Sequence, residues 1–202
     1  MAKQTLSVSC VNWRDAFPYQ PQATVEVSAD SSSVNILFSV SGKEILAAST
    51  ADHSNVWCDS CVEFFCRVPE SEHYINFEMN CVGAMTAARR RGRNDDVQHL
   101  SLDLLSQIKR YAPLSMESII PFHVQSDKCW HAGMTVPFHI IYGMTLDEWR
   151  QAGAPVPEKL LCNFYICADK ADEPYFVSWA PIYTPAPDFH RPEFFKELNL
   201  KS

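Results

Sequence analysis

The chain has 202 residues, of which 47% are hydrophobic and 12% aromatic, so it can bury a full core and is not a disordered chain. Its 17 basic and 24 acidic side chains give a formal net charge of −7. This charge argues against a nucleic-acid-binding protein, which needs a broad basic surface. The length predicts a single domain over residues 1–202.

The N-terminal stretch MAKQTLSVSC contains no apolar segment typical of a signal peptide. No apolar run approaches the roughly 20 residues that cross a bilayer, so no membrane span is predicted. We therefore expect a cytoplasmic protein, or one that acts outside the cytoplasm if a leader has been removed. The eight cysteines are interpreted mostly as buried thiols that behave as small hydrophobic side chains.

Alternation of apolar and polar residues predicts the first strands. The stretch SVNILFSV places every second apolar side chain on one face, which is the pattern of a half-buried strand. The stretches CVEFFCRV and YINFEMNC repeat this pattern and are separated by the turn-like PESEH, which predicts a hairpin. If these two strands pair in the simplest way, Glu63 shares a sheet face with Asn76 and Glu78.

The remaining chain continues the pattern with few helices. Strands are predicted over 134–141, 159–168 and 175–182. The stretch TLDEWRQAG predicts one helix, with Thr145 as N-cap, Glu148 three residues later and Gly153 as the stop. The stretch LSLDLLSQIKRYA fits either a strand or a helix, and the proline-rich C-terminal stretch predicts an ordered loop that ends in one helical turn.

These elements together predict the fold class. Many short strands around one stretch of core indicate an all-β protein, an antiparallel β-sandwich of two packed sheets. We expect it to be immunoglobulin-like or jelly-roll-like, with one or two short helices. The sequence shows no internal repeat and no Gly/Ser linker.

Four residues before and within the first hairpin strand have a loose metal-ligand spacing: His53, Cys58, Cys61 and Cys66. A structural zinc site usually needs two ligand pairs, and the sequence has no second C-x-x-C and no H-x-x-x-H. A redox C-x-x-C typically opens a helix, whereas a strand follows here. Cys61 and Cys66 also fall on opposite faces of a regular strand. Incidental thiols are therefore the preferred interpretation over zinc or redox chemistry.

Glu63 lies among apolar neighbours in CVEFF, so its carboxylate is solvated, paired or functional. A catalytic acid needs a second carboxylate roughly 5–10 Å away, and Glu78 can supply it across the hairpin. The same pair can instead bind sugar hydroxyls or pair with an arginine, and spacing alone does not rank these alternatives. Trp57, just before the strand, is either a core residue or a platform on which a sugar ring stacks.

The stretch AARRRGRND contains four arginines within five residues. It is either a solvated loop or a contact for an anion such as a uronic acid. The histidines are scattered, without a chelating pair. No G-x-S-x-G, Walker or dinucleotide-binding motif is present, so hydrolase-triad, NTPase and dinucleotide functions lack support.

Two stretches together resemble the carbohydrate-binding modules of family 9. The first is WCDSCVEFF, in which Glu63 follows Trp57 by six residues as in the family's W-x-x-x-x-x-E-x-F pattern, and the strand YINFEMN follows it. The second is VSWAPIYTPAPDFHRPEFFKELNL, which resembles the C-terminal end of the family's domain. The resemblance spans about residues 24–200 and is strongest to the family 9-like proteins found outside xylanases.

The resemblance implies a sandwich in which two aromatic rings clamp a terminal sugar and charged side chains bind its hydroxyls. Trp57 matches the first ring and Glu63 the hydroxyl-binding glutamate, whereas Glu78 stands where the modules have a basic side chain. The second ring falls in the C-terminal loop, whose candidate sugar-binding residues are Asp188, Phe189, His190 and Arg191. His190 or Phe189 replaces the family's tryptophan there, and Arg191 can restore the positive charge that Glu78 removes.

The leading hypothesis is a non-catalytic protein that binds a mono- or oligosaccharide and is linked to polysaccharide breakdown. The alternatives are a glycoside hydrolase that uses Glu63 and Glu78, and a structural sandwich domain that has lost its sugar site. Some family modules hold calcium, but the sequence has no clear acidic loop cluster, so neither calcium nor another metal or cofactor is predicted. Haem is not predicted, because no Met/His ligand pair can be assigned. The sequence indicates neither a particular sugar nor an oligomeric state.

Overall fold

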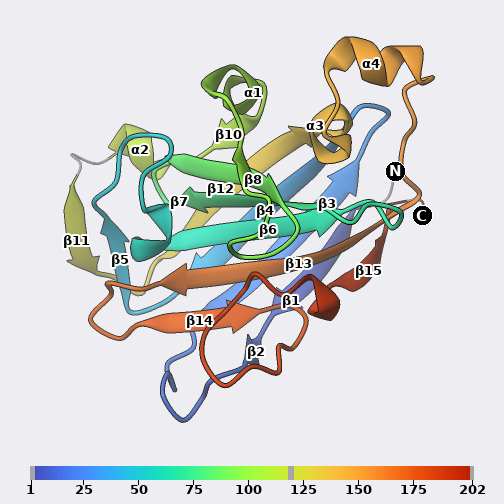
Figure 1. Cartoon of the computed structure of the whole chain (residues 1–202). Coiled ribbons are helices and arrows are strands. Elements are labelled where there is room, and N and C mark those ends of the chain that lie inside the picture. Colours follow the sequence, from blue (N-terminus) through green and yellow to red (C-terminus); the bar gives the residue numbers. More distant parts are fainter. Residues whose placement is uncertain (1–2, 118–120, 201–202) are drawn as a thin grey trace.

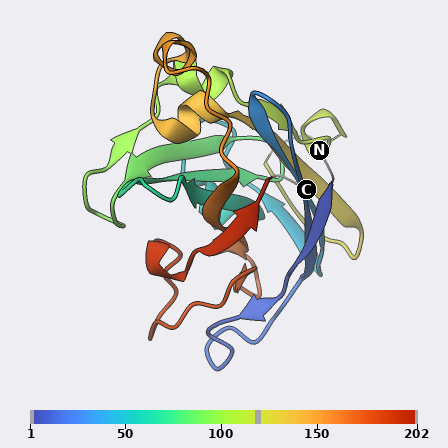
Figure 2. The same ribbon diagram turned by 90° about the vertical axis from the view of Figure 1, so that its right-hand side faces the viewer.

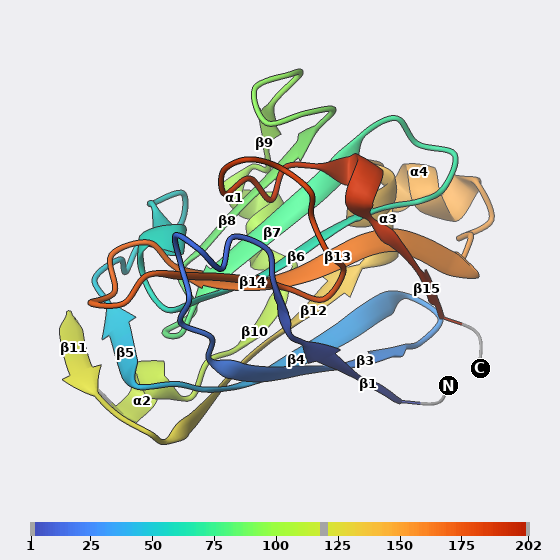
Figure 3. The same cartoon turned by 90° about the horizontal axis from the view of Figure 1, so that it is seen from below.

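The computed structural model describes residues 3–117 and 121–200 of the chain. Its two large antiparallel sheets pack face to face, which confirms the predicted all-β sandwich (Figure 1). Two views at right angles to the first show the sheets as separate layers (Figures 2 and 3). Among the described residues, no helix has the length and apolar character that a membrane crossing requires.

The smaller of the two sheets has the strand order β1-β3-β4-β12-β10. Its strands are β1 (Gln4–Val8), β3 (Gln22–Ala29), β4 (Ser33–Ser41), β12 (Cys129–Pro137) and β10 (Lys109–Tyr111). Strand β4 contains the stretch SVNILFSV, and its side chains alternate between buried and half-buried along most of the strand, as predicted. A separate two-stranded ribbon pairs β5 (Glu44–Ala47) with β11 (Phe122–Gln125).

The larger sheet has eight strands in the order β2-β14-β13-β6-β7-β8-β9, with β15 paired to β13 beside this path. Its strands are β2 (Cys10–Val11), β6 (Cys61–Arg67), β7 (Tyr74–Asn80), β8 (Met85–Arg90), β9 (Gln98–His99), β13 (Lys159–Ala168), β14 (Tyr175–Ser178) and β15 (Lys196–Asn199). The predicted hairpin is the β6–β7 pair, in which Glu63 lies directly opposite Glu78. This sheet carries the pocket described below.

Phenylalanines from both sheets form the centre of the core. Phe64 of β6 stacks on Phe77 of β7 and on Phe164 of β13, with ring centroids 6.1 and 5.2 Å apart. Phe38 of the smaller sheet meets Phe164 edge to face at 6.0 Å. Because side chains alternate along a strand, the neighbours of these phenylalanines point to the opposite face of the larger sheet. The core packing therefore directs residues such as Glu63 toward the outer face.

The described residues form four short α-helices, where one or two were expected: α1 (Leu102–Ser106), α2 (Leu114–Glu117), α3 (Phe138–Tyr142) and α4 (Leu146–Gln151). Helix α4 is the predicted one, since Thr145 Oγ1 accepts from the Glu148 backbone N–H at 3.2 Å and Glu148 Oε2 accepts from the Thr145 N–H at 2.8 Å. The ambiguous stretch LSLDLLSQIKRYA contains both kinds of element, α1 followed by β10.

Three sequence predictions on element boundaries were wrong. The strand predicted over 134–141 ends at Pro137, which has no N–H to continue the strand pairing, and α3 begins at the next residue. The strand predicted over 175–182 ends at Ser178. The C-terminal stretch does contain a helical turn, η2 (Pro192–Phe194), but it continues into the strand β15, which pairs with β13.

A second apolar cluster covers part of the outer face of the larger sheet. The C-terminal segment lies on this face, on the side away from the smaller sheet (Figure 3). Phe189 of this segment stacks on Tyr165 of β13, with ring centroids 4.2 Å apart, and Trp13 packs against Phe189 at 5.9 Å. These contacts hold the C-terminal loop against the sheet, next to the polar part of the same face.

Candidate functional site

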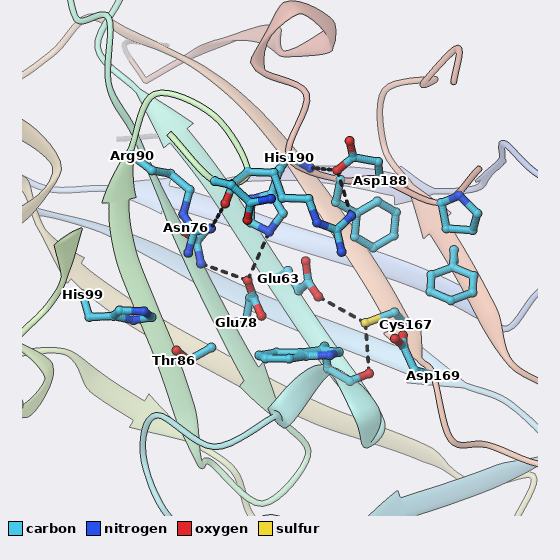
Figure 4. Close-up of a pocket in the computed structure, with 16 residues that line it drawn as sticks. Glu63, Asn76, Glu78, Thr86, Arg90, His99, Cys167, Asp169, Asp188 and His190 are labelled. Atoms are coloured by element: carbon cyan, nitrogen blue, oxygen red, sulfur yellow. Dashed lines mark hydrogen bonds and ion pairs between the residues drawn. The ribbon is translucent and has the colours of Figure 1, made fainter. Parts of the chain in front are cut away.

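A pocket of about 350 Å³ opens on the outer face of the larger sheet, beside the C-terminal loop 187–190 (Figure 4). Strands β6, β7, β8 and β13 contribute polar side chains to it, including Glu63, Asn76, Glu78, Thr86, Arg90 and Cys167. Trp57, from the short 3-10 helix η1 (Val56–Cys58), also lines the pocket and is partly buried. The sheet thus supplies a rigid floor, and η1 and the C-terminal loop supply walls.

Strand register places the acidic groups of the floor. Glu63, Glu78 and Thr86 form one row across β6, β7 and β8, because each lies opposite the next in the antiparallel pairing. Asn76 lies two residues before Glu78 and therefore points to the same face. The predicted shared face of Glu63, Asn76 and Glu78 is confirmed.

Both glutamates are buried, with exposed fractions of 2% for Glu63 and 5% for Glu78. Burial raises the pKa of Glu78 to about 7, against the opposing effects of Arg90 and of the Asn76 amide. Burial and then the charge of Glu78 raise the pKa of Glu63 well above its ordinary value. Two adjacent carboxyl groups in a poorly solvated site hold on to protons, so this pair is partly protonated near neutral pH.

Two polar atoms of the pocket have unused hydrogen-bonding capacity. The Asn76 Nδ2 group donates to Glu78 Oε1 at 2.9 Å, but its Oδ1 has no partner among the described residues. Arg90 donates from Nη1 to the Arg93 carbonyl at 2.9 Å, whereas its Nε has no partner there. Asn76 is 1% exposed and Arg90 is 9% exposed. Buried polar groups are normally hydrogen-bonded, so an acceptor and a donor left open in a pocket indicate places for ligand groups.

His190 brings the C-terminal loop to the carboxyl pair. Its Nδ1 lies 2.9 Å from the Tyr74 hydroxyl, and its Nε2 lies 4.0 Å from Glu78 Oε1. Its backbone N–H donates to Asp188 Oδ1 at 3.1 Å, which shapes the loop. Burial, followed by the charges of Arg90 and Arg93, lowers the pKa of His190 to about 3. The ring is therefore neutral in the folded protein.

The structure brings six of the seven predicted site residues to the pocket: Trp57, Glu63, Glu78, Asp188, Phe189 and His190. Of the two candidates for the second ring, Phe189 has one face against Tyr165, whereas the His190 ring lies 4.0 Å from the Glu78 carboxyl group. Arg191 does not line the pocket, and instead forms ion pairs with Asp188 at 2.7 Å and Glu193 at 3.7 Å.

The positive charge that was expected from Arg191 comes from elsewhere. Arg90 and Arg93 line the pocket, and Arg93 Nη1 lies 3.3 Å from Asp188 Oδ1. Both belong to the arginine-rich stretch AARRRGRND, which was the available sequence signal for an anionic or sugar contact. Cys167 and Asp169, at the end of β13, had no such signal, because only the pairing of β13 with β6 brings them here.

Two groups of side chains have metal-ligating atoms close together. Cys61, Glu63 and Cys167 place a sulfur or carboxylate oxygen each within 4.8 Å of one another at the pocket floor. Glu44, His123 and Asp172 do so at the ribbon of β5 and β11, where the His123 ring hydrogen-bonds to Glu44 and links the two strands. Of the four residues with a loose metal-ligand spacing in the sequence, Cys61 belongs to the first group, whereas His53, Cys58 and Cys66 belong to neither.

These features define an antiparallel β-sandwich with a preformed polar pocket on the outer face of one sheet. The sequence profile of Carbohydrate-binding family 9 matches residues 1–200, and the chain belongs to this family. No curated protein matches the chain.

Solved structures provide a second comparison. The chain is 28% identical to a protein from Bacteroides uniformis that is provisionally named as carbohydrate-binding, with a TM-score of 0.84 over 97% of this chain and 85% of that one. It also matches a family 9 module from Caldicellulosiruptor kristjanssonii, solved with cellotriose and with glucose. These two matches have 11% and 12% identity and TM-scores of 0.48 and 0.49, and cover 91% of this chain and 76% and 78% of the module.

Proposed function

We propose that this protein binds the end of a mono- or oligosaccharide in the pocket on the outer face of the larger sheet, without breaking a bond. One observation carries the proposal: an acceptor, Asn76 Oδ1, and a donor, Arg90 Nε, are buried on neighbouring strands of one pocket and have no hydrogen-bond partner in the part of the chain that the structure describes. A sugar hydroxyl both donates and accepts hydrogen bonds, so adjacent hydroxyls of one ring can satisfy both atoms.

The pocket volume and charge suit a small polar ligand. A volume of about 350 Å³ lies at the lower end of the roughly 300–1,000 Å³ typical of small-molecule sites. Because burial keeps protons on Glu63 and Glu78, the floor offers both donors and acceptors rather than two fixed negative charges. Trp57 at the wall provides an apolar surface for the C–H face of a sugar ring. Membership of a carbohydrate-binding family supports the same ligand class and a role in polysaccharide breakdown.

Isothermal titration against a panel of mono- and disaccharides tests the proposal. Trp57→Ala should weaken binding of any sugar that binds by about tenfold, since ring contacts contribute on the order of 1 kcal/mol beyond area. Tyr183→Ala is the matched control, because Tyr183 is an exposed ring of the C-terminal segment that does not line the pocket. The absence of heat with every sugar would instead support a structural domain without a working site.

A second function, glycoside hydrolysis, is favoured by one observation: Glu63 and Glu78 face one pocket with raised pKa values, as expected of a general acid and its partner. Turnover of chromogenic glycosides distinguishes it. Hydrolysis that is present in the natural protein and lost in Glu63→Gln would establish an enzyme. Binding without turnover would leave the pair as hydroxyl-binding groups.

A further inference from the structure

The floor of the pocket contains two thiols and a carboxyl group in mutual contact. Cys61 of β6 lies directly opposite Cys167 of β13, and Glu63 is two residues further along β6 on the same face. The Cys167 thiol donates to Glu63 Oε1 at 3.1 Å. The sulfur atoms and the carboxylate oxygen all lie within 4.8 Å of one another. Both cysteines are free thiols and both are buried.

We propose that Cys61, Cys167 and Glu63 bind a thiophilic divalent cation, with Zn²⁺ as the physiological candidate. Thiolate and carboxylate ligands bind zinc at distances of about 2.3 Å and 2.0–2.2 Å. Ligand atoms of a tetrahedral site therefore lie roughly 3–4 Å apart, and the 3.1 Å contact between Cys167 and Glu63 already has this separation. Two sulfurs favour zinc or cadmium over calcium or magnesium, which prefer oxygen.

The proposed site is open on one side. Glu63 and Cys167 line the pocket, whereas Cys61 is fully buried and does not, so a fourth ligand would come from the pocket as water or as a hydroxyl group. Three protein ligands and one open position are the arrangement of an exchangeable zinc site rather than a closed structural one. The metal would therefore lie at the base of the same pocket that is proposed to bind sugar.

Metal binding would replace protons at this site. Burial raises the pKa of Cys61 to about 12, and the hydrogen bond with Cys61, followed by burial, raises the pKa of Cys167, so both sulfurs carry protons in the metal-free protein. A divalent cation compensates the loss of these protons, because it supplies the positive charge that buried thiolates need. The positive charge of Arg93 lowers the pKa of Glu63 and therefore also favours the ionised carboxylate that a metal ion needs.

The same two strands provide a matched control. Cys66 and Cys162 also lie directly opposite each other on β6 and β13, and both are buried. They point into the apolar core between the sheets, next to Phe64 and Phe164, whereas Cys61 and Cys167 lie next to Glu63. The two cysteine pairs therefore share their strands and burial but differ in their access to the pocket and to a carboxyl group.

Titration of the reduced full chain with Co²⁺, without sugar, tests the inference independently of the proposed function. One Co²⁺ per chain should produce thiolate-to-metal charge-transfer absorption and the intense visible bands of tetrahedral cobalt, and Zn²⁺ should displace it. Cys61→Ala and Cys167→Ala should each abolish the charge-transfer band, whereas Cys66→Ala and Cys162→Ala should keep it. Glu63→Gln, which preserves shape, should weaken binding roughly tenfold or more.

Three outcomes would overturn the inference: a natural protein without the charge-transfer band, a band that the core-pair substitutions reduce as strongly as the pocket-pair substitutions, or unchanged affinity in Glu63→Gln. Circular dichroism checks that each variant is folded. If one alanine variant fails to fold, the other and Glu63→Gln still decide the result, because each removes a different proposed ligand.

Discussion

Glu63 and Glu78 lie directly opposite each other on β6 and β7, and both face the same pocket from buried positions. Opposed like charges destabilise a strand pair, and burial adds a desolvation cost to each charge. Protonation of the carboxyl groups removes the repulsion and the desolvation cost, which is why the pKa of each group is raised. The charge of the pocket, and with it part of the stability of the fold, therefore changes near neutral pH.

The first prediction concerns Glu78→Gln. Folding raises the pKa of Glu78 from 4.5 to about 7, so the folded state binds more protons than the unfolded state between these pH values. The stabilisation from this group is fully present below about pH 4 and is lost as the pH rises through 7. Relative to the natural protein, Glu78→Gln should therefore gain about 3 kcal/mol in free energy of unfolding between pH 4 and pH 8.

Urea unfolding at several pH values, in the presence of a chelator, measures this difference. The charge of Glu78 also raises the pKa of Glu63, and Glu78→Gln removes this effect, which adds to the gain in stability in the same direction. A free-energy difference between the two proteins that stays constant with pH would contradict the prediction.

The second prediction concerns His190→Gln and has the opposite sign. The pKa of His190 falls from 6.5 to about 3 on folding, so the unfolded state binds the extra proton. The stabilisation from the neutral ring is present above about pH 6.5 and is lost as the pH falls toward 3. As the pH falls through this range, the free energy of unfolding should decrease less steeply in the variant than in the natural protein, by about 1.4 kcal/mol per pH unit. Circular dichroism measures acid unfolding of both proteins. Identical unfolding curves would contradict the prediction.

Local patterns in the sequence were sufficient to predict several of these elements. Alternation along CVEFF and YINFEMN predicted the β6–β7 hairpin and the shared face of Glu63 and Glu78, because their register follows from a short turn. Helix α4 followed from Thr145 and Glu148, which satisfy backbone groups at its own N-terminus. The single domain over 1–202 and the cytoplasmic location stay predictions.

Other features depend on contacts between distant segments or on weaker signals. Cys167 reaches Glu63 only because β13 pairs with β6 across about a hundred residues, which no local pattern specifies. Helix α3 did have a signal that was missed, since Pro137 precedes it and Gly143, with φ of 69°, ends it. Arg191 adjoins the predicted ring residues in sequence, yet its ion pair with Glu193 lies outside the pocket.

The third prediction compares two arginines that share one partner. Arg93 and Arg191 both pair with Asp188, at 3.3 and 2.7 Å, but only Arg93 also lines the pocket. Arg93→Ala should weaken sugar binding several-fold, because it removes a donor and the positive charge that offsets the carboxyl pair. Arg191→Ala should change the affinity by less than about twofold, since the Arg191 guanidinium is partly exposed and does not line the pocket. Titration calorimetry measures both, and equal losses would contradict the assignment.

The last prediction concerns two tyrosine hydroxyls that hold the C-terminal loop. Tyr74 bonds to His190 Nδ1 at 2.9 Å, and the Tyr165 hydroxyl donates to the Phe189 carbonyl at 3.2 Å. Phenylalanine at either position keeps the stacked rings and removes only the hydroxyl, so each substitution should cost about 1 kcal/mol of stability.

Loss of these hydroxyls should loosen the loop more than it destabilises the sheet. Tyr74→Phe and Tyr165→Phe should therefore speed amide hydrogen exchange in residues 187–191 more than in the centre of β6. Tyr74→Phe should also weaken sugar binding more than Tyr165→Phe does. The Tyr74 hydroxyl positions His190, which lies next to Glu78, whereas Phe189 stays stacked on the ring at position 165. Exchange that rises equally in the loop and in β6 would show that these hydroxyls support the whole fold rather than the pocket wall.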